Sequence, residues 1–274
     1  MSADQPTPGE RTRRPLSIAA LGSSFASGPG IDPLIDPIAM RSGRNYAHQL
    51  ADRIGADLVD VTTSGATTAN LLDTPQEAGP GQALRPQLDR VPADTDIVTI
   101  TAGGNDLQFS AALLHTAWAH TDPQQLMDGV FPDGVPFPSD EDVERATAGL
   151  VRVVDAARSK ASRARVILVD YLTVLDPVSS RSALFSEDEV RDFLVIQAAL
   201  ARAFTDAADR TGADLVRAST LSAAHAWDSS DPWVQPFHTD LTRTGASFHP
   251  NDAGMTAIAL ALTRLIAAHS DPAR

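Results

Sequence analysis

The 274-residue chain contains no cysteine. This absence excludes disulfide bonds, catalysis by a thiol and metal sites built on thiolates, and it fits a reducing compartment. No apolar run is long enough to span a bilayer, so we expect no membrane insertion. Basic residues are few, because 22 Lys and Arg stand against 35 Asp and Glu, a formal net charge of −13. This negative charge argues against a nucleic acid or an anionic membrane as partner.

The N-terminal segment lacks the pattern of a secretory signal. Residues 1–14 are polar and include three arginines, and the apolar stretch that follows is short. Cleavage near Ala19 or Ala20 would remove the first predicted strand. We therefore expect residues 1–14 to be a flexible tail and the protein to be cytoplasmic.

Short apolar segments alternate with longer amphipathic ones along the chain, which is typical of strands that alternate with helices. The predicted strands cover residues 16–21, 57–62, 96–101, 165–169 and 214–217. The predicted helices run from a cap at Ser42 to Gly55, over 107–120 and 141–162, from a cap at Ser186 to Arg210, and over 252–269. This order predicts an α/β protein, a three-layer α/β/α sandwich around a central, mainly parallel five-stranded sheet. With no internal repeat or linker, we expect one domain over residues 15–274.

Three irregular segments interrupt this alternation at residues 31–40, 121–140 and 223–245. The second holds four prolines, and an insertion of this length inside a compact domain is often a lid or a pocket wall. We expect the paths of these three segments to set the depth of any pocket.

The turn after the first strand carries the candidate nucleophile, Ser24. An uncharged apolar run ends there in Gly22 and Ser23, and a strand, tight turn and helix in that order lift a serine toward a cleft. A serine turn alone is weak support, because serines also fill turns and helix caps. The rest of the chain must supply a base and hydrogen-bond donors.

Candidates for these partners follow other predicted strands. Gly65 lies in the turn after the second strand, and Asn105 follows a double glycine after the third. In open parallel sheets the site lies beyond the carboxyl ends of the strands, so these turns should share one edge. His249 enters the last helix and could reach back to the first strand. Acyl transfer by serine needs such a base, donors for the oxyanion and a group that orients the imidazole.

Four stretches of the chain resemble, in order and spacing, the four blocks of the SGNH hydrolase superfamily, also called the GDSL esterases and lipases. They are residues 22–24 with Gly28 beyond, 64–65, 103–106 and 247–251. The resemblance covers nearly the whole chain after the tail. It implies a flavodoxin-like sheet with Ser24 as nucleophile and His249 as base. It also implies an oxyanion hole formed by the N–H groups of Ser24 and Gly65 and by the Asn105 amide.

Two positions depart from the pattern of this superfamily. Ser23 stands where an aspartate usually precedes the nucleophile, and Ala246 stands three residues before the histidine, where the triad acid usually sits. We therefore predict a Ser24–His249 dyad, oriented by the backbone carbonyl of Ala246 or a neighbour. A carboxylate from elsewhere, such as Asp240, is the lesser alternative.

The predicted function is hydrolysis of a small-molecule acyl ester through an acyl-serine intermediate, with no cofactor and no metal. The same machinery would suit a thioesterase or a carbohydrate O-deacetylase. An α/β-hydrolase is disfavoured, because that fold places its nucleophile much later in the chain. A different class is a non-catalytic module that binds phosphate or flavin at the same sheet edge, and a family member without activity is a third possibility. The sequence leaves the natural ester, its chain length and the oligomeric state open.

Overall fold

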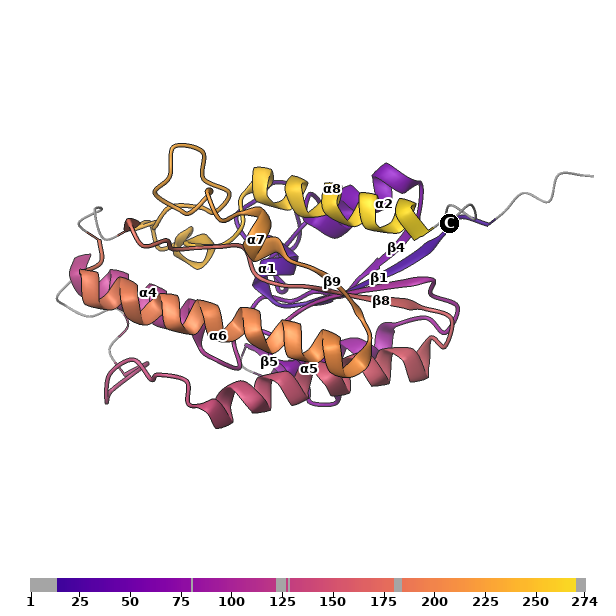
Figure 1. Ribbon diagram of the computed structural model, residues 1–274, viewed down its shortest axis with the longest axis horizontal. Coiled ribbons are helices and arrows are strands. Elements are labelled where there is room, and N and C mark those ends of the chain that lie inside the picture. Colours follow the sequence, from indigo (N-terminus) through magenta and orange to yellow (C-terminus); the bar gives the residue numbers. More distant parts are fainter. Residues whose placement is uncertain (1–13, 80, 122–126, 128, 180–183, 270–274) are drawn as a thin grey trace, which may run out of the picture.

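The computed structural model describes residues 14–79, 81–121, 127, 129–179 and 184–269 (Figure 1). Its centre is a five-stranded sheet with the order β4-β1-β7-β8-β9, in which every neighbouring pair is parallel. The strands are β1 (Ser17–Gly22), β4 (Asp57–Asp60), β7 (Ile97–Thr101), β8 (Arg165–Val169) and β9 (Asp214–Val216). The predicted sheet is confirmed, and this strand order is that of flavodoxin. All but the last residue of the predicted tail lies outside the described residues.

Strand β1, which leads to the candidate nucleophile, lies between β4 and β7 in the sheet. It pairs with β4 from Ser17 to Ala20 and with β7 from Ile18 to Gly22. Residues 18–21 are fully buried, which explains why this strand is a continuous apolar run rather than an alternating one. Its parallel neighbours therefore end beside it, at one edge of the sheet.

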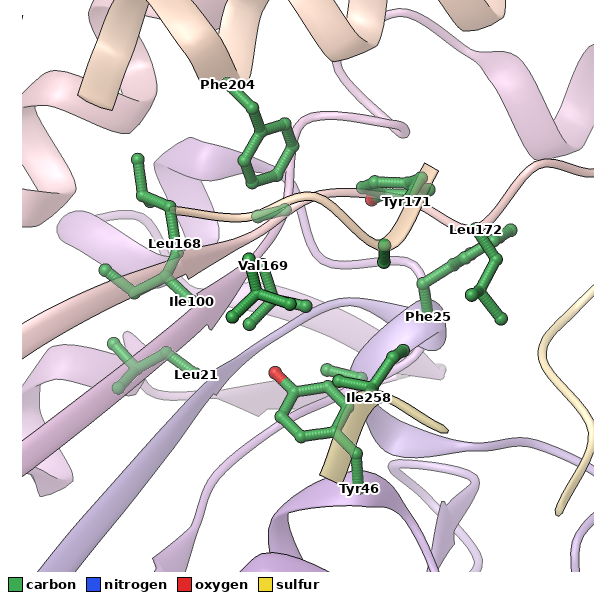
Figure 2. Packing of buried hydrophobic residues seen from close by; sticks show 14 of the residues in the cluster. Leu21, Phe25, Tyr46, Ile100, Leu168, Val169, Tyr171, Leu172, Phe204 and Ile258 are labelled. Carbon is green, nitrogen blue, oxygen red and sulfur yellow. The ribbon is translucent and has the colours of Figure 1, made fainter. Parts of the chain in front are cut away.

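Helices cover both faces of the sheet (Figure 1). Helices α2 (Tyr46–Ile54) and α8 (Asp252–His269) lie on one face. Helices α5 (Asp140–Lys160) and α6 (Glu187–Thr211) lie on the other, with α3 (Thr68–Leu72) against α5 and α4 (Phe109–Thr121) against α6. Two short helices, α1 (Ser24–Ser27) and α7 (Ala218–Leu221), follow strands β1 and β9. Figure 2 shows Leu21, Ile100 and Leu168 between Phe204 on one side and Tyr46 and Ile258 on the other.

The sequence predicted serine caps for two helices, and the structure confirms one of them. Ser186 caps α6 as predicted, since its side chain accepts the N–H of Glu189. The predicted cap at Ser42 is wrong, because Asn45 caps α2 by accepting the N–H groups of Ala47 and His48. An asparagine directly before the helix reaches the free N–H groups of its first turn.

Two short hairpins and two 3-10 turns were not expected from the sequence. The hairpins pair β2 (Leu34–Asp36) with β3 (Arg41–Ser42) and β5 (Gln76–Gly79) with β6 (Gln82–Leu84), in segments predicted as loops. The 3-10 turns are η1 (Gln87–Arg90) and η3 (Thr244–Ala246). Within the predicted insertion at 121–140, residues 122–126 and 128 lie outside the described part. No helix among the described residues combines the length and the apolar character needed to cross a membrane.

Asn45 caps α2 and also forms a hydrogen bond to a buried carboxylate. Its Nδ2 also donates to the buried carboxylate of Asp60 at 2.7 Å. We expect Asn45→Ala to lower the free energy of unfolding by about 2–3 kcal/mol, combining the cap with a charge-assisted hydrogen bond. Urea unfolding measures the loss.

Ser139→Ala is the matched control, because Ser139 caps α5 at an exposed position and its hydroxyl donates to the partly exposed carboxylate of Asp142 rather than to a buried one. Its expected cost is about 1 kcal/mol. Equal losses in the two variants would contradict a structural role for the bond to Asp60.

Candidate active site

The turn that carries Ser24 is fixed by hydrogen bonds from two other segments. The N–H of Ser23 donates to the Thr101 carbonyl at the end of β7, at 2.8 Å. The side chain of Gln87 accepts the N–H of Gly22 at 2.8 Å and donates to its carbonyl at 3.0 Å. The chain therefore leaves β1 in one direction and begins α1 at Ser24.

Ser24 and His249 are 225 residues apart in the sequence, and the fold brings them into contact. The Nε2 atom of His249 lies 2.8 Å from the Oγ atom of Ser24. Gln235 holds the two loops together, since its Nε2 donates to the carbonyls of Pro29 and Pro250, at 2.8 and 3.2 Å. The backbone of Gln235 also pairs with Phe248 and His249. The histidine is thus placed by a buried polar side chain that joins its loop to the segment after Ser24.

The other ring nitrogen of His249 identifies the orienting group. Nδ1 lies 2.9 Å from the backbone carbonyl of Ser247. The prediction named the carbonyl of Ala246 or a neighbour, and the structure selects the neighbour Ser247, because the Ala246 carbonyl accepts the backbone N–H of His249 at 3.2 Å. Phe248 adopts a left-handed backbone with φ of 61°, and this bend brings the ring over the Ser247 carbonyl. Asp240 does not reach the ring nitrogen, since its exposed carboxylate accepts the N–H and hydroxyl of Thr242.

The carbonyl partner determines the protonation of the imidazole. A carbonyl oxygen only accepts hydrogen bonds, so Nδ1 must carry a proton, and in the neutral ring Nε2 then presents a lone pair to Ser24. Burial lowers the pKa of His249 to about 4, although the carbonyls of Ser247 and Ala246 favour the charged form. The ring is therefore neutral near pH 7 and poised to accept the Ser24 proton.

Free donors lie on the turns that hydrogen bonds join to the Ser24 turn, since Ser27 Oγ lies 2.9 Å from Ser64 Oγ and Asn105 bonds Ala66. Within the described residues, the N–H groups of Ser24 and Gly65 donate to no acceptor. Gly65 has φ of +81°, a conformation that favours glycine, and its turn is held where Ser64 donates to the Ala39 carbonyl at 2.9 Å. The Asn105 amide donates one hydrogen to the Ala66 carbonyl at 2.9 Å, which leaves its second N–H available.

Tyr171 joins the nucleophile turn to the asparagine turn, a role that no sequence motif indicates. Its hydroxyl lies 2.9 Å from Ser23 Oγ and accepts the N–H of Gly104 at 3.0 Å. Burial raises the pKa of Tyr171, so the hydroxyl keeps its proton. A Cβ atom on Gly104 would lie 2.6 Å from the tyrosine ring, which explains the glycine there. The available signal was its position, just past the end of β8 at the same sheet edge.

Aromatic rings and one carboxylate complete the surroundings of the site. The Phe25 ring lies between Tyr171, at a centroid distance of 4.4 Å (Figure 2), and His249, at 5.2 Å. The Asp106 carboxylate accepts the N–H and hydroxyl of Thr68, so it supports the start of α3 and not the reaction centre. The described residues contain no group of three His, Asp or Glu side chains that could hold a metal ion.

The bridging hydroxyl of Tyr171 gives a second prediction. In Tyr171→Phe, the buried Ser23 hydroxyl and Gly104 N–H both lose their partner, and we expect about 2–3 kcal/mol less free energy of unfolding. Tyr46→Phe is the matched control, since the Tyr46 hydroxyl pairs with Thr101 Oγ1, at 3.0 Å, and accepts no backbone N–H among the described residues. Urea unfolding should show the smaller loss for Tyr46→Phe; the reverse order would contradict the bridging role.

Comparisons with known proteins find lipases similar to this chain in sequence and in fold. Lipase 2 of Streptomyces coelicolor is 32% identical over 260 residues, which cover 87% of this chain and 82% of that protein. The crystal structure of an extracellular lipase from Streptomyces rimosus has a TM-score of 0.69 at 22% identity, covering 91% of this chain and 99% of that one. Phospholipase A1 from Streptomyces albidoflavus has a TM-score of 0.69 at 20% identity, covering 93% and 99%. These two structures share the fold.

The match to a protein family spans the whole arrangement from the nucleophile strand to the last helix. The GDSL-like Lipase/Acylhydrolase family matches residues 20–257, which include Ser24, Gly65, Asn105 and His249. The family predicted from the four motifs is therefore confirmed: the chain belongs to the GDSL-like lipase/acylhydrolase family of carboxylic ester hydrolases.

Proposed function

We propose that Ser24 and His249 form the catalytic dyad of this ester hydrolase. The observation that carries the proposal is the 2.8 Å contact between Ser24 Oγ and His249 Nε2, together with the Ser247 carbonyl at Nδ1. This pair of contacts leaves only one neutral tautomer, the one that can remove the serine proton.

In the first half of the reaction, Ser24 Oγ attacks the ester carbonyl carbon while its proton moves to His249 Nε2. The carbonyl oxygen becomes an oxyanion and accepts hydrogen bonds from the N–H groups of Ser24 and Gly65 and from the Asn105 amide. The tetrahedral intermediate then breaks its bond to the alcohol oxygen, which takes the proton from His249. The acyl group remains on Ser24.

In the second half, a water molecule attacks the acyl-serine and His249 takes one of its protons. Collapse of this second tetrahedral intermediate releases the carboxylic acid and returns the proton from His249 to Ser24. The same three donors stabilise both oxyanions, because the carbonyl oxygen occupies the same position in each half. No cofactor takes part in this cycle.

For the substrate we propose an ester with an apolar acyl chain. Leu34, Ile35 and Ile38 are about half exposed on the β2–β3 hairpin, an unusual concentration of aliphatic side chains. The hairpin borders the Gly65 turn through the bond between Ser64 and Ala39. These exposed aliphatic side chains favour a substrate with an apolar acyl chain over an acetylated sugar. The similarity to a protein named as a lipase supports an ester of this class. A cytoplasmic location stays a prediction from the sequence.

Removing either member of the dyad tests the proposal. We expect Ser24→Ala and His249→Ala each to lower kcat for p-nitrophenyl esters by at least about 10³-fold, because neither residue works without the other. A series from acetate to palmitate would also measure the acyl chain that fits. His120→Gln is the control, since His120 pairs with Glu189 away from the site and should keep full turnover. Unchanged turnover in Ser24→Ala would refute the nucleophile.

The depressed pKa of His249 predicts the pH dependence. The base is active when neutral, so kcat/KM should stay level as the pH falls through 6.5 and decline only near pH 4, where the buried ring takes up a proton. The measurement is kcat/KM across pH 3.5 to 8 on an ester that is stable over this range, with unfolding followed in parallel by circular dichroism. A half-maximal value near pH 6.5 would contradict the burial of the base.

A further inference from the structure

A cavity of about 440 Å³ lies beside the Gly65 turn, outside the site described above. Thr63 lines it from the end of β4, and Gln76 lines it from β5 while donating to the Ser64 carbonyl at 2.8 Å. Gln87, which holds the turn before Ser24, also lines it. The cavity is therefore built on the same supporting residues as the nucleophile and the oxyanion turn.

The charged residues around this cavity are mostly basic. Three arginines, Arg41, Arg85 and Arg90, line it together with a single acid, Asp36. Three other cavities of the described structure have different charged residues in their linings. One has two aspartates, one has two aspartates and one arginine, and one has one glutamate and one arginine. A basic lining is thus exceptional in a chain with a net charge of −13, and it needs an explanation.

Arg41 is a fixed donor at the floor of the cavity. It is 8% exposed, its Nε donates to the Thr62 carbonyl at 2.9 Å, and its Nη2 lies 3.2 Å from Asp36. The buried carboxylate of Asp60 lies 3.6 Å from Nε and compensates the positive charge of Arg41. Its Nη1 has no acceptor within the described residues.

Asp36 adds little acceptor capacity to the cavity. One of its carboxylate oxygens accepts the N–H groups of Ile38 and Ala39, each at 3.1 Å, and the other faces Arg41. Both carboxylate oxygens of Asp36 are therefore occupied by its own hairpin and by Arg41. Asp36 offers no further oxygen to Arg85 or Arg90.

Arg85 and Arg90 supply the uncompensated charge. Both are exposed at the cavity, one after β6 and the other at the end of η1. Neither forms an ion pair or a side-chain hydrogen bond with any residue that the structure describes. Two planar guanidinium groups beside a fixed third one match the oxygen atoms of a phosphate group, which prefers bidentate arginine contacts.

We propose that this cavity is a binding site for a phosphate group, held by Arg85 and Arg90 with Arg41 Nη1 as the fixed donor. The phosphate is either a free ion or part of the ester substrate, and both share this chemistry. Binding itself does not depend on the proposed function, whereas a role in substrate selection does, because it requires turnover at Ser24.

The first experiment measures binding of inorganic phosphate by isothermal titration calorimetry at low ionic strength, where charged contacts are least screened. The double variant Arg85→Gln/Arg90→Gln should bind phosphate at least about tenfold more weakly than the wild type. Arg163→Gln is the control, because Arg163 is an exposed arginine that lines none of these cavities. No binding by the wild type, or equal binding by the double variant, would overturn the proposal.

The second experiment separates the two sources of the phosphate. It compares kcat/KM for 1-butyrylglycerol 3-phosphate and for neutral 1-butyrylglycerol in the wild type and the double variant. A selective loss of at least about tenfold for the phosphate ester identifies a substrate subsite. Unchanged ratios beside weakened phosphate binding identify a site for a free ion. If the wild type hydrolyses neither these two esters nor any p-nitrophenyl ester from acetate to palmitate but still binds phosphate, the proposed function fails and the site stands.

Discussion

Parallel pairing of β1 between β4 and β7 is the constraint on which the rest of this structure depends. Strands that run in one direction end at one edge, so the turns after these three strands lie side by side. Those turns carry Ser24, Gly65 and Asn105. Tyr171 and Asp106 then tie the turns to one another with side-chain hydrogen bonds, and Gln87 fixes the Ser24 turn to η1. The geometry of the site is thus set by the sheet and refined by buried polar contacts.

The absence of a carboxylate beside His249 changes the electrostatics of the dyad. A carboxylate about 4 Å from the charged ring would stabilise it by about 4 kcal/mol at an effective dielectric constant of about 20. The Ser247 carbonyl supplies one hydrogen bond, worth about 1.5–3 kcal/mol to a charged partner. Burial of the ring is therefore not offset, and the base stays neutral over a wide pH range. The carbonyl fixes the tautomer, which is the function that the reaction needs most.

Much of the fold followed from the sequence, because β1, β7 and β8 are largely apolar runs and α6 begins at a clear serine cap. The predicted β8 and α8 match the structure at both ends, and Ser186 caps α6. The two hairpins were missed, since their strands are only two to four residues long and no run of alternating apolar residues marks them. The sequence left the partner of Nδ1 open between Ala246 and its neighbours, because the choice of Ser247 depends on the left-handed backbone of Phe248, a bulky residue that rarely adopts it. The roles of Tyr171 and Gln235 depend on tertiary contacts alone.

The most direct test of the account is covalent labelling of the nucleophile. A fluorophosphonate transfers its phosphonyl group to a serine that a base has activated, and peptide mass spectrometry then locates the adduct. We expect one adduct per chain, on Ser24, formed rapidly by the wild type and far more slowly by folded His249→Ala. A carboxylate-to-amide change at Asp240 should leave the labelling rate unaltered. An adduct on another serine, or equal labelling without His249, would contradict a Ser24–His249 dyad oriented by a backbone carbonyl.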